Sequence, residues 1–264
     1  MNTEALEHGV CRLSIIPVRG EASDKAELVS QLLFGEHYEV MSASKDKKWL
    51  RIKNYFDQYE GWIDAKQHHA ITKEYFDYFN RVDFKITTDT TTSILYNKIP
   101  IAIVMGSVIP ISGSELFKME EQFAFNGESK SIGVKRDAEF LKITALKYLN
   151  APYQWGGKSP FGIDCSGFTQ MVFKINGHKL QRDAFQQAKQ GKSIAQKDAQ
   201  LGDLAFFKSK DSKVSHVGIL LGKDKIIHAS GKVRVDHFNE EGILQGETKV
   251  CSHTSPSIRR ILTE

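Results

Sequence analysis

Residues 151–173 read APYQWGGKSPFGIDCSGFTQMVF, and this stretch decides the fold because a glycine-rich turn runs directly into an amphipathic helix. From Cys165 onward, apolar residues recur at helical spacing and share one face. Gly177 follows the last of them as a stop signal. The spacing therefore predicts a helix with Cys165 in its first turn and with one apolar face: Phe168, Met171, Val172 and Ile175.

Cys165 is the first candidate for chemistry. The unpaired N–H groups and the positive dipole end at a helix start favour an anion, so we expect this thiol to ionise more readily than an ordinary one. The alternative is structural, because a single cysteine in an amphipathic helix is more often a small core residue. The preceding aromatic and glycine cluster in Y-x-W-G-G, followed by D-C-S-G-F, favours the catalytic interpretation, since packing alone does not require it.

Two histidines are the candidate partners of this thiol. His216 opens the apolar run HVGILLG, and histidine has an ordinary pKa suited to taking a proton and returning it to a leaving amine. His228, in IIHAS, lies on the next predicted strand. Because two strands joined by a short turn place such positions side by side, His228 can fix the tautomer of His216.

The rest of residues 134–264 predicts an α+β domain. A first helix is expected in DAEFLKITALKYLNAPY, and a polar helical stretch runs from Asp183 to about Gly191. The runs LGDLAFF, HVGILLG, KIIHAS and KVRVDHF predict an antiparallel sheet. The first helix is predicted from apolar residues near helical spacing: Phe140, Leu141, Ile143, Leu146 and Leu149.

The N-terminal half predicts two small all-β modules. Residues 1–71 contain the short runs CRLSIIPV, LVSQLL, YEVMSAS, WLRIKN and YEGWID between turn-rich stretches, which are typical of the strands of a small barrel. For LVSQLLFGE the alternative is a loop that lies across the barrel. Residues 72–133 repeat this texture in FKITTDTTTSILY, AIVMGSVIPISG and EQFAFNG. We find no strict internal sequence repeat.

Composition excludes several classes of function. The formal charge of +4 from 36 basic and 32 acidic residues is spread along the chain, which is too mild to indicate nucleic-acid binding. No apolar run approaches the ~18 residues of a membrane span. We therefore expect a soluble, cytoplasmic protein, although a chain whose signal peptide had been removed would look the same and would be periplasmic or secreted.

The remaining cysteines and histidines are interpreted as structural or surface residues. Cys11, in VCRLSII, is predicted to be a buried strand residue, and Cys251 lacks a helix-start setting. No histidine shows a metal-ligand spacing, so we expect no metal and no organic cofactor. The histidines interpreted as solvated are His68, His69, His178, His237 and His253.

The motifs APYQWGG, FGIDCSGFTQMVF, LGDLAFF, SHVGILLG and IIHAS, in this order, resemble the NlpC-type family of papain-like cysteine peptidases. The resemblance covers residues 134–264 and implies a papain-like α+β catalytic domain. It implies Cys165 as nucleophile, His216 as base and His228 as the orienting residue. Tyr153 would border the oxyanion site together with the backbone N–H of Cys165, and Asp164 and Ser166 would flank a substrate subsite.

The two β modules resemble bacterial SH3-type barrels, and the combination resembles the γ-D-glutamyl-L-diamino-acid endopeptidases that process murein peptides. That resemblance implies an active-site cleft beside the first barrel and recognition of the free amine of an N-terminal L-alanine. Asp183 matches the expected carboxylate, Glu27 and Tyr59 are the matching positions in the first barrel, and Trp155 would wall the subsite. The structural alternatives are a helix cap for Asp183 and barrel core for Tyr59.

The resemblance implies hydrolysis, through a thioester, of the bond between γ-D-glutamate and a diamino acid, either meso-diaminopimelate or lysine. The substrate would be a murein peptide of the type L-Ala-γ-D-Glu-diamino acid, in cell-wall recycling or turnover, and the enzyme would be a monomer. One alternative is an amidase or acyltransferase on the same scaffold, because Cys–His chemistry does not determine what resolves the thioester. The other is a peptidoglycan-binding module with an idle third domain.

Overall fold

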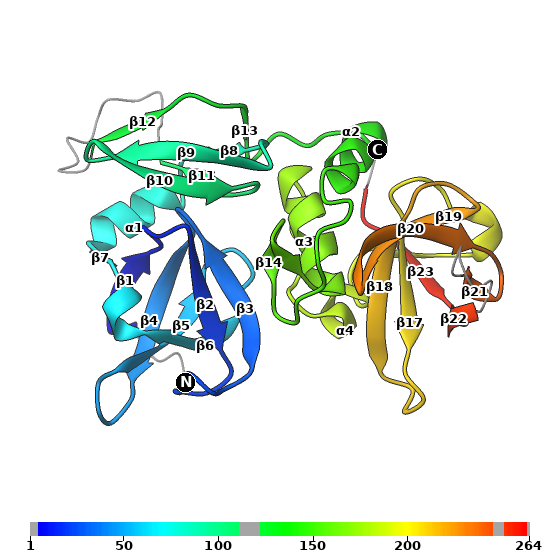
Figure 1. The fold of residues 1–264 in the computed structure, drawn as a ribbon, viewed down its shortest axis with the longest axis horizontal. Helices are drawn as coiled ribbons and strands as arrows, with labels where there is room; N and C mark the ends of the chain where they lie inside the picture. The colour runs from blue at the N-terminus through cyan, green and yellow to red at the C-terminus, as the bar shows by residue number, and fades with distance from the viewer. Residues whose placement is uncertain (1–4, 111–121, 245–250, 263–264) are drawn as a thin grey trace. The chain divides into compact units, whose positions relative to one another are not determined.

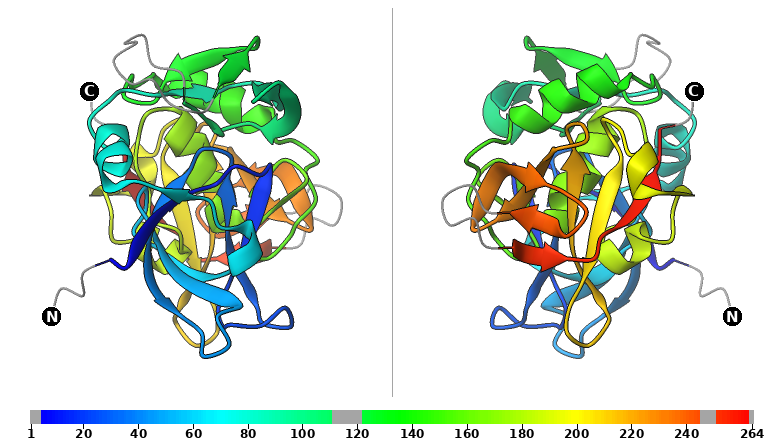
Figure 2. Two further views of the ribbon diagram at one scale, coloured as in Figure 1. Left: turned by 90° about the vertical axis from the view of Figure 1, so that its left-hand side faces the viewer. Right: turned by 90° about the vertical axis from the view of Figure 1, so that its right-hand side faces the viewer.

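The computed structural model describes residues 5–110, 122–244 and 251–262, and most of its secondary structure is β-strand. The chain divides into two compact units, Met1–Val134 and Lys135–Glu264. Figures 1 and 2 show the strands of each unit gathered into sheets, with most of the helical structure of the second unit on one side of its sheet.

The first unit is built around a twisted antiparallel sheet with strand order β3-β2-β6-β5-β4-β1-β7 among its described residues. Each of the five apolar runs in residues 1–71 contributes a strand to this sheet, including LVSQLL, for which the sequence also left a loop across the barrel open. The core between the strands includes Cys11, Ile16, Tyr38 and Ile52. The bounds are β1 Glu7–Val10, β2 Ile15–Arg19, β3 Leu28–Leu33, β4 His37–Ala43, β5 Trp49–Asn54, β6 Glu60–Asp64 and β7 Ala70–Ile71, with a short 3-10 helix at Ala65–Gln67.

Residues 72–133 contain a helix that the sequence analysis missed. Helix α1, Lys73–Phe79, begins at the N-cap Thr72, whose hydroxyl accepts a hydrogen bond from the Tyr75 N–H, and it buries Phe76 and Phe79. The prediction of an all-β second module was therefore wrong at this segment.

The strands of residues 72–133 form two small sheets, β10-β9-β12 and β11-β8-β13. Their bounds are β8 Lys85–Thr87, β9 Thr91–Tyr96, β10 Ile99–Val104, β11 Val108–Ile109, β12 Phe123–Phe125 and β13 Ser129–Ser131. Residues 111–113 of the predicted run AIVMGSVIPISG lie outside the described residues.

The second unit contains an antiparallel sheet with order β16-β23-β17-β18-β19-β20-β21-β22 in its described part. The predicted strands LGDLAFF, HVGILLG, KIIHAS and KVRVDHF form its middle. The bounds are β16 Lys192–Ile194, β17 Leu204–Lys208, β18 Val214–Leu220, β19 Lys225–Ser230, β20 Lys232–Phe238, β21 Gly242–Leu244, β22 Cys251–Thr254 and β23 Ser257–Arg260.

Helices pack on this sheet, and a small β-hairpin directly precedes α3, the longest of them. Helix α3, Cys165–Ile175, is buried along its whole length and packs on β18 and β19, while α2, Ala138–Leu146, packs on α3. The predicted polar helix is short, since α4 spans only Ala184–Gln187. The hairpin strands are β14 Lys158–Ser159 and β15 Gly162–Ile163, and a 3-10 helix lies at Gln196–Asp198.

The buried face of α2 differs from the predicted one. Of the apolar residues that predicted this helix, Leu141 is buried, whereas Ile143 and Leu146 are exposed, as is Leu149 just beyond the helix end. The face that packs instead includes Ala145 together with Thr144. The periodicity thus located the helix correctly, but the face turned inward is formed by Leu141, Thr144 and Ala145.

Candidate active site

Cys165 is the first residue of α3, and the N-cap Asp164 holds this helix start in place. Oδ1 of Asp164 accepts the Gly167 N–H at 2.6 Å, and Oδ2 accepts the Gly156 N–H at 2.8 Å. Arg182 forms a two-pronged ion pair with the same carboxylate, with Nη2 to Oδ2 at 2.6 Å and Nη1 to Oδ1 at 3.1 Å. Both side chains are buried, so the pair fixes the backbone from which the thiol projects.

Ser166 belongs to the same buried network. Its hydroxyl lies 3.3 Å from Oδ1 of Asp164 and 3.0 Å from Nη1 of Arg182. Its carbonyl accepts a hydrogen bond of 2.9 Å from the Gln187 side chain, which ties the first turn of α3 to α4. Asp164 and Ser166, expected to flank a substrate subsite, thus both have internal partners, and Arg182 is a residue that sequence reasoning missed.

The glycines of the motif permit a close approach of backbones. A Cβ at Gly157 would lie 2.3 Å from the carbonyl oxygen of Gly162, and one at Gly167 would lie 2.2 Å from the carbonyl oxygen of Gly157. The second contact joins the turn before β14 to the first turn of α3. The interpretation that packing does not require this glycine cluster was therefore wrong, because packing requires at least these two.

His216 is presented by a local irregularity in β18. Phe207 of β17 pairs with His216, but the next residue, Lys208, pairs with Val214, so that Ser215 is the extra residue of a β-bulge. Such bulges re-aim side chains and are frequent beside active sites. Because β18 packs against α3, the strand that carries His216 lies against the helix that begins with Cys165.

A hydrogen-bonded series of side chains extends from His216 into the sheet. Nε2 of His216 lies 2.7 Å from Nδ1 of His228, and Nε2 of His228 lies 3.0 Å from Oδ2 of Asp236. Arg234 closes the series, with Nε 2.8 Å from Oδ2 of Asp236 and Nη2 donating to Oδ1 at 2.9 Å. Gly218 pairs with His228 across the strands, and a Cβ there would lie 2.9 Å from the His228 Cβ. The expected proximity of the two imidazoles is thus present, while Asp236 and Arg234 were not foreseen.

His253 is a third imidazole at the site, and its interpretation as a solvated surface residue was wrong. Its ring stacks on that of His216 with centroids 4.2 Å apart and an interplanar angle of 26°. Burial lowers the pKa of His253 to about 4, so this ring is neutral at neutral pH. His178 is likewise buried rather than solvated. The surface interpretation of His253 failed because β22 joins the sheet and places His253 beside His216, which is far from it in sequence. No local sequence pattern indicates such a contact.

The thiol itself departs from expectation. Burial raises the pKa of Cys165 to about 12, and the nearby Asp164 carboxylate adds to this rise. Hydrogen bonds from the backbone of Val217 and Ser166, and the Arg182 charge, act in the opposite direction. The prediction of an acidified thiol is therefore wrong for a Cys165 thiol that ionises alone, because burial raises its pKa more than the groups around it lower it.

The imidazole shows the complementary effect. Burial lowers the pKa of His216 well below its ordinary value, and the neighbouring His228 and His253 add to the decrease. A thiolate alone and an imidazolium alone are thus both unfavourable in this site. The hydrogen bond from the backbone of Val217, the residue after His216, to the thiol places the two groups at neighbouring positions. The arrangement therefore suits transfer of the thiol proton to the imidazole, which creates both charges together as a pair.

Tyr153 and Trp155 stand before the helix in the segment that leads to β14. Burial raises the pKa of Tyr153 to about 12, with further increases from Cys165 and Asp164, which keeps its hydroxyl protonated and able to donate a hydrogen bond. The Trp155 side chain is exposed, at 59% of its surface. An indole with this exposure is not part of the core.

Asp183, the expected amine-binding carboxylate, is the N-cap of α4. It forms a capping box with Gln186, whose side-chain oxygen accepts the Asp183 N–H at 3.1 Å. The structural alternative for this residue is therefore present. In the first unit, Glu27 is exposed just before β3, and Tyr59 precedes β6 with its N–H donating to Asp57 Oδ1 at 3.1 Å. Within the described part of either unit, no contact assigns Asp183, Glu27 or Tyr59 to a substrate, and these roles stay predictions.

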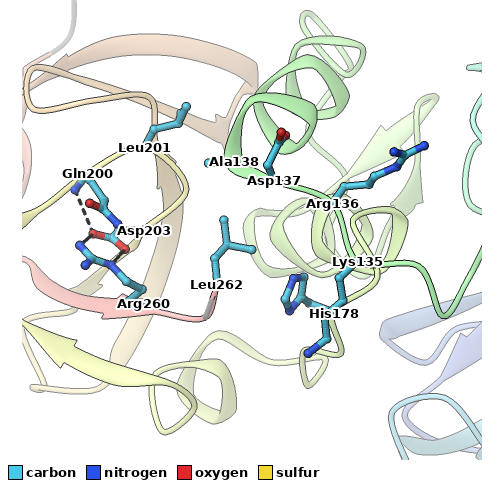
Figure 3. A pocket seen from close by; sticks show the side chains of 10 residues that line it. All are labelled: Lys135, Arg136, Asp137, Ala138, His178, Gln200, Leu201, Asp203, Arg260 and Leu262. Carbon is cyan, nitrogen blue, oxygen red and sulfur yellow. Dashed lines mark hydrogen bonds and ion pairs between the residues drawn. The ribbon is translucent and has the colours of Figure 1, made fainter. Parts of the chain in front are cut away.

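A separate pocket of about 340 Å³ lies elsewhere in the second unit, and its lining includes none of Cys165, His216 or His228. Figure 3 shows its side chains, with dashed lines joining Arg260 to Asp203. The Arg260 Nε and Nη2 atoms each donate to Asp203 at 2.8 Å. Among the described residues, no group of three or more His, Cys, Asp or Glu side chains is placed to hold a metal ion.

Two known families match this chain, and each match lies within one of its two compact units. Residues 150–251 match the NlpC/P60 family, and residues 18–67 match the bacterial dipeptidyl-peptidase SH3 domain. The first match spans α3 with Cys165 and the strands with His216 and His228. The second runs from the last two residues of β2 through β6, which makes the N-terminal part of the chain SH3-like.

Relatives of known name extend these matches. A γ-D-glutamyl-L-lysine dipeptidyl-peptidase of Bacillus subtilis is 39% identical over 132 residues, which cover 47% of this chain but only 45% of that protein. Dipeptidyl-peptidase 6 of Lysinibacillus sphaericus is 29% identical over 244 residues, which cover 82% of this chain and 86% of that protein.

A crystal structure of an NlpC/P60 family protein from Bacillus cereus superposes with a TM-score of 0.77 at 20% identity, covering 97% of this chain and all of that one. At that identity the superposition establishes a shared fold only. In the part of the chain that the structure describes, no helix is long and apolar enough to cross a membrane.

Proposed function

Because this chain carries an NlpC/P60 cysteine peptidase domain behind a bacterial dipeptidyl-peptidase SH3 domain, we propose that it hydrolyses the bond between γ-D-glutamate and an L-diamino acid in murein peptides. The names of its relatives support this bond, since two of them are dipeptidyl-peptidases. The single observation that carries the proposal is the placement of Cys165 at a helix start beside the strand of His216, with His228 2.7 Å behind that imidazole.

The reaction proceeds by way of a thioester. The Cys165 sulfur attacks the γ-carbonyl carbon of D-glutamate while its proton passes to His216, and the carbonyl oxygen becomes an oxyanion. The backbone N–H of Cys165 and the Tyr153 hydroxyl are the proposed donors to that oxyanion. Collapse breaks the C–N bond, and His216 returns the proton to the departing diamino acid. Water then attacks the thioester, with His216 as base, and releases L-Ala-γ-D-Glu and the thiol.

Recognition of a free N-terminal L-alanine is the finer part of the proposal. Asp183 lies 18 positions after Cys165, directly next to Arg182 of the helix-start network, and a carboxylate there suits an ammonium group. Its capping of α4 is compatible with this role, because a capping carboxylate retains further acceptor sites. The expected parts of Glu27, Tyr59 and Trp155 in substrate binding, and an SH3-like fold for residues 72–133, stay predictions.

Product analysis tests this proposal. The purified protein is incubated with L-Ala-γ-D-Glu-meso-diaminopimelate, the lysine analogue, and an N-acetylated form of each, and the products are identified by mass spectrometry. We expect L-Ala-γ-D-Glu and free diamino acid from the unblocked peptides, and at least tenfold less from the acetylated ones. Cys165→Ala should abolish the cleavage and Cys251→Ala should not. Undiminished cleavage by Cys165→Ala, or a transferred acyl group in place of the free dipeptide, would overturn the assignment.

A further inference from the structure

Asp236 is a buried carboxylate that the reaction above does not use. It lies on β20, its side chain is 1% exposed, and its Oδ2 is 3.0 Å from Nε2 of His228. Arg234, two positions earlier on the same strand, supplies the cation that balances it. A buried charge that is retained behind two imidazoles calls for a role that packing does not supply.

We infer that Asp236 is a positioning residue, which fixes the tautomer of His228 and, through it, that of His216. The inference deepens the proposed function and rests on it, since it assigns Asp236 a part in preparing the same Cys–His pair. Asp236 acts through the two rings, because it contacts His228 and His228 contacts His216.

The direction of the hydrogen bonds gives the physical reason. A carboxylate only accepts, so Nε2 of His228 must carry the hydrogen that faces Asp236. In a neutral imidazole the other nitrogen is then an acceptor, so Nδ1 of His228 receives the hydrogen on Nε2 of His216 across the 2.7 Å contact. This leaves Nδ1 of His216 without a hydrogen, which is the state needed to take a proton from a thiol.

Removal of the Asp236 carboxylate would leave the tautomers of His228 and His216 unfixed. If Nε2 of His228 lost its fixed acceptor, His228 could carry its hydrogen on Nδ1 and donate to His216, whose remaining hydrogen would then sit on Nδ1. A ring in that tautomer cannot accept the thiol proton. His253, stacked on His216, holds the plane of the ring but makes no hydrogen bond with it that would select the tautomer.

The same sheet contains a matched pair without an imidazole. Asp203, which directly precedes β17, is 1% exposed at its side chain and pairs with Arg260, 25% exposed, at 2.8 Å. Asp236 and Arg234 have nearly the same values, 1% and 23%, and the same separation. Asp203→Asn therefore reproduces the loss of a buried Asp–Arg pair at a site that includes neither His216 nor His228, and Figure 3 shows that pair in its own pocket.

The direct test is the ring tautomer measured by nitrogen NMR on histidine-labelled Cys165→Ala protein. We expect both His216 and His228 in the form with hydrogen on Nε2. Asp236→Asn in this background should convert His228 to the other tautomer or to a mixture, whereas Asp203→Asn should leave both rings unchanged. Arg234→Gln keeps the carboxylate and should also keep the tautomer. Hydrogen on Nδ1 of His228 in the Cys165→Ala parent would overturn the inference without any Asp236 variant.

Two kinetic measurements, made on protein that retains Cys165, complement the NMR spectrum. Asp236→Asn should lower kcat for the tripeptide by about tenfold to a hundredfold with KM within about twofold, as expected for a residue that supports the base and does not bind substrate. Its rate of Cys165 alkylation by iodoacetamide, followed on the Cys165 peptide by mass spectrometry, should fall in parallel. Asp203→Asn should change neither rate by more than about twofold.

The outcomes separate the two proposals. Equal losses in Asp236→Asn and Asp203→Asn, or an unchanged tautomer in Asp236→Asn, would show that Asp236 only stabilises the sheet. If the unsubstituted protein alkylates readily at Cys165 but leaves the tripeptide intact, the proposed substrate is wrong while the tautomer and alkylation readouts still decide the role of Asp236.

Discussion

At the scale of single residues, the Asp164–Arg182 pair is the feature on which the position of the thiol most depends. Arg182 is 1% exposed and contacts both carboxylate oxygens and the Ser166 hydroxyl. Loss of one partner from such a pair leaves an uncompensated buried charge, which is strongly destabilising. The pair therefore couples the stability of the second unit to the geometry of its helix start.

Arg182→Gln should thus lower the free energy of unfolding by about 3–5 kcal/mol. Urea unfolding followed by circular dichroism measures this change. The exposed pair Arg51–Glu60, with side chains 50% and 42% exposed, provides the control, since Arg51→Gln should cost no more than about 1 kcal/mol. A loss below 1 kcal/mol in Arg182→Gln would show that the Asp164 carboxylate is not held by this guanidinium.

The residues that sequence reasoning found differ from those it missed in one respect. Cys165, His216 and His228 stand in motifs whose local pattern already identifies them. Asp236 and His253 reach the site only through the register of β19 with β20 and the return of β22 to the sheet. The alternation in KVRVDHF gave no signal for Asp236, because it places this residue on the polar face with Lys232 and Arg234, whereas Asp236 is buried in the structure.

At the scale of elements, most helices and strands follow from periodicity, and the misses have identifiable causes. Helix α1 carried a cap at Thr72, an acid at Glu74 and apolar residues at Phe76 and Phe79, all of which are helix signals that the strand-rich surroundings obscured. Helix α4 ended early because only Ala184 and Gln187 of its residues are buried. Length, unlike position, depends on packing that the sequence does not reveal.

The contact between the turn before β14 and α3 provides a prediction at this scale. Gly167→Ala would place a Cβ 2.2 Å from the Gly157 carbonyl oxygen, a backbone atom that cannot rotate away. We expect the helix start to shift, a loss of stability of about 1–3 kcal/mol, and at least a tenfold fall in kcat. Gly20→Ala, where the nearest atom is 3.4 Å away, is the control. Full activity in Gly167→Ala would mean that the close approach does not position the thiol.

At the scale of the whole molecule, the buried neutral histidines give stability a pH dependence of definite sign. The pKa of His216 and of His253 lies below 6.5 in the folded protein, the latter at about 4. Between pH 6.5 and 4 the unfolded chain therefore binds more protons than the folded one, and stability falls as pH falls. The lowered pKa of His68 in the first unit acts in the same direction.

We accordingly predict that the free energy of unfolding decreases between pH 6.5 and pH 5. Each histidine contributes at most about 1.4 kcal/mol per pH unit, and His253 contributes less because solvent screens it. Urea unfolding at the two pH values measures the slope, and His253→Gln should make it shallower. A stability that is constant or rises toward pH 5 would contradict the neutral burial of these rings.

Properties of the whole chain are the part that sequence reasoning left least determined. The unit boundary after Val134 falls next to the residue at which the texture of the sequence changes from strand-like to helical. The expected monomeric state, the cytoplasmic location and the preferred diamino acid stay predictions, because each depends on surfaces or partners that neither periodicity nor motif spacing encodes.

The most direct measurement of the central claim is the mass of the enzyme during turnover. The protein is mixed with L-Ala-γ-D-Glu-diamino acid, quenched in acid within a fraction of a second, digested and analysed by mass spectrometry. We predict an L-Ala-γ-D-glutamyl group in thioester linkage on the peptide that contains Cys165, and its absence in Cys165→Ala. Rapid cleavage with the acyl group on Cys251 or on no cysteine, together with an active Cys165→Ala variant, would contradict it.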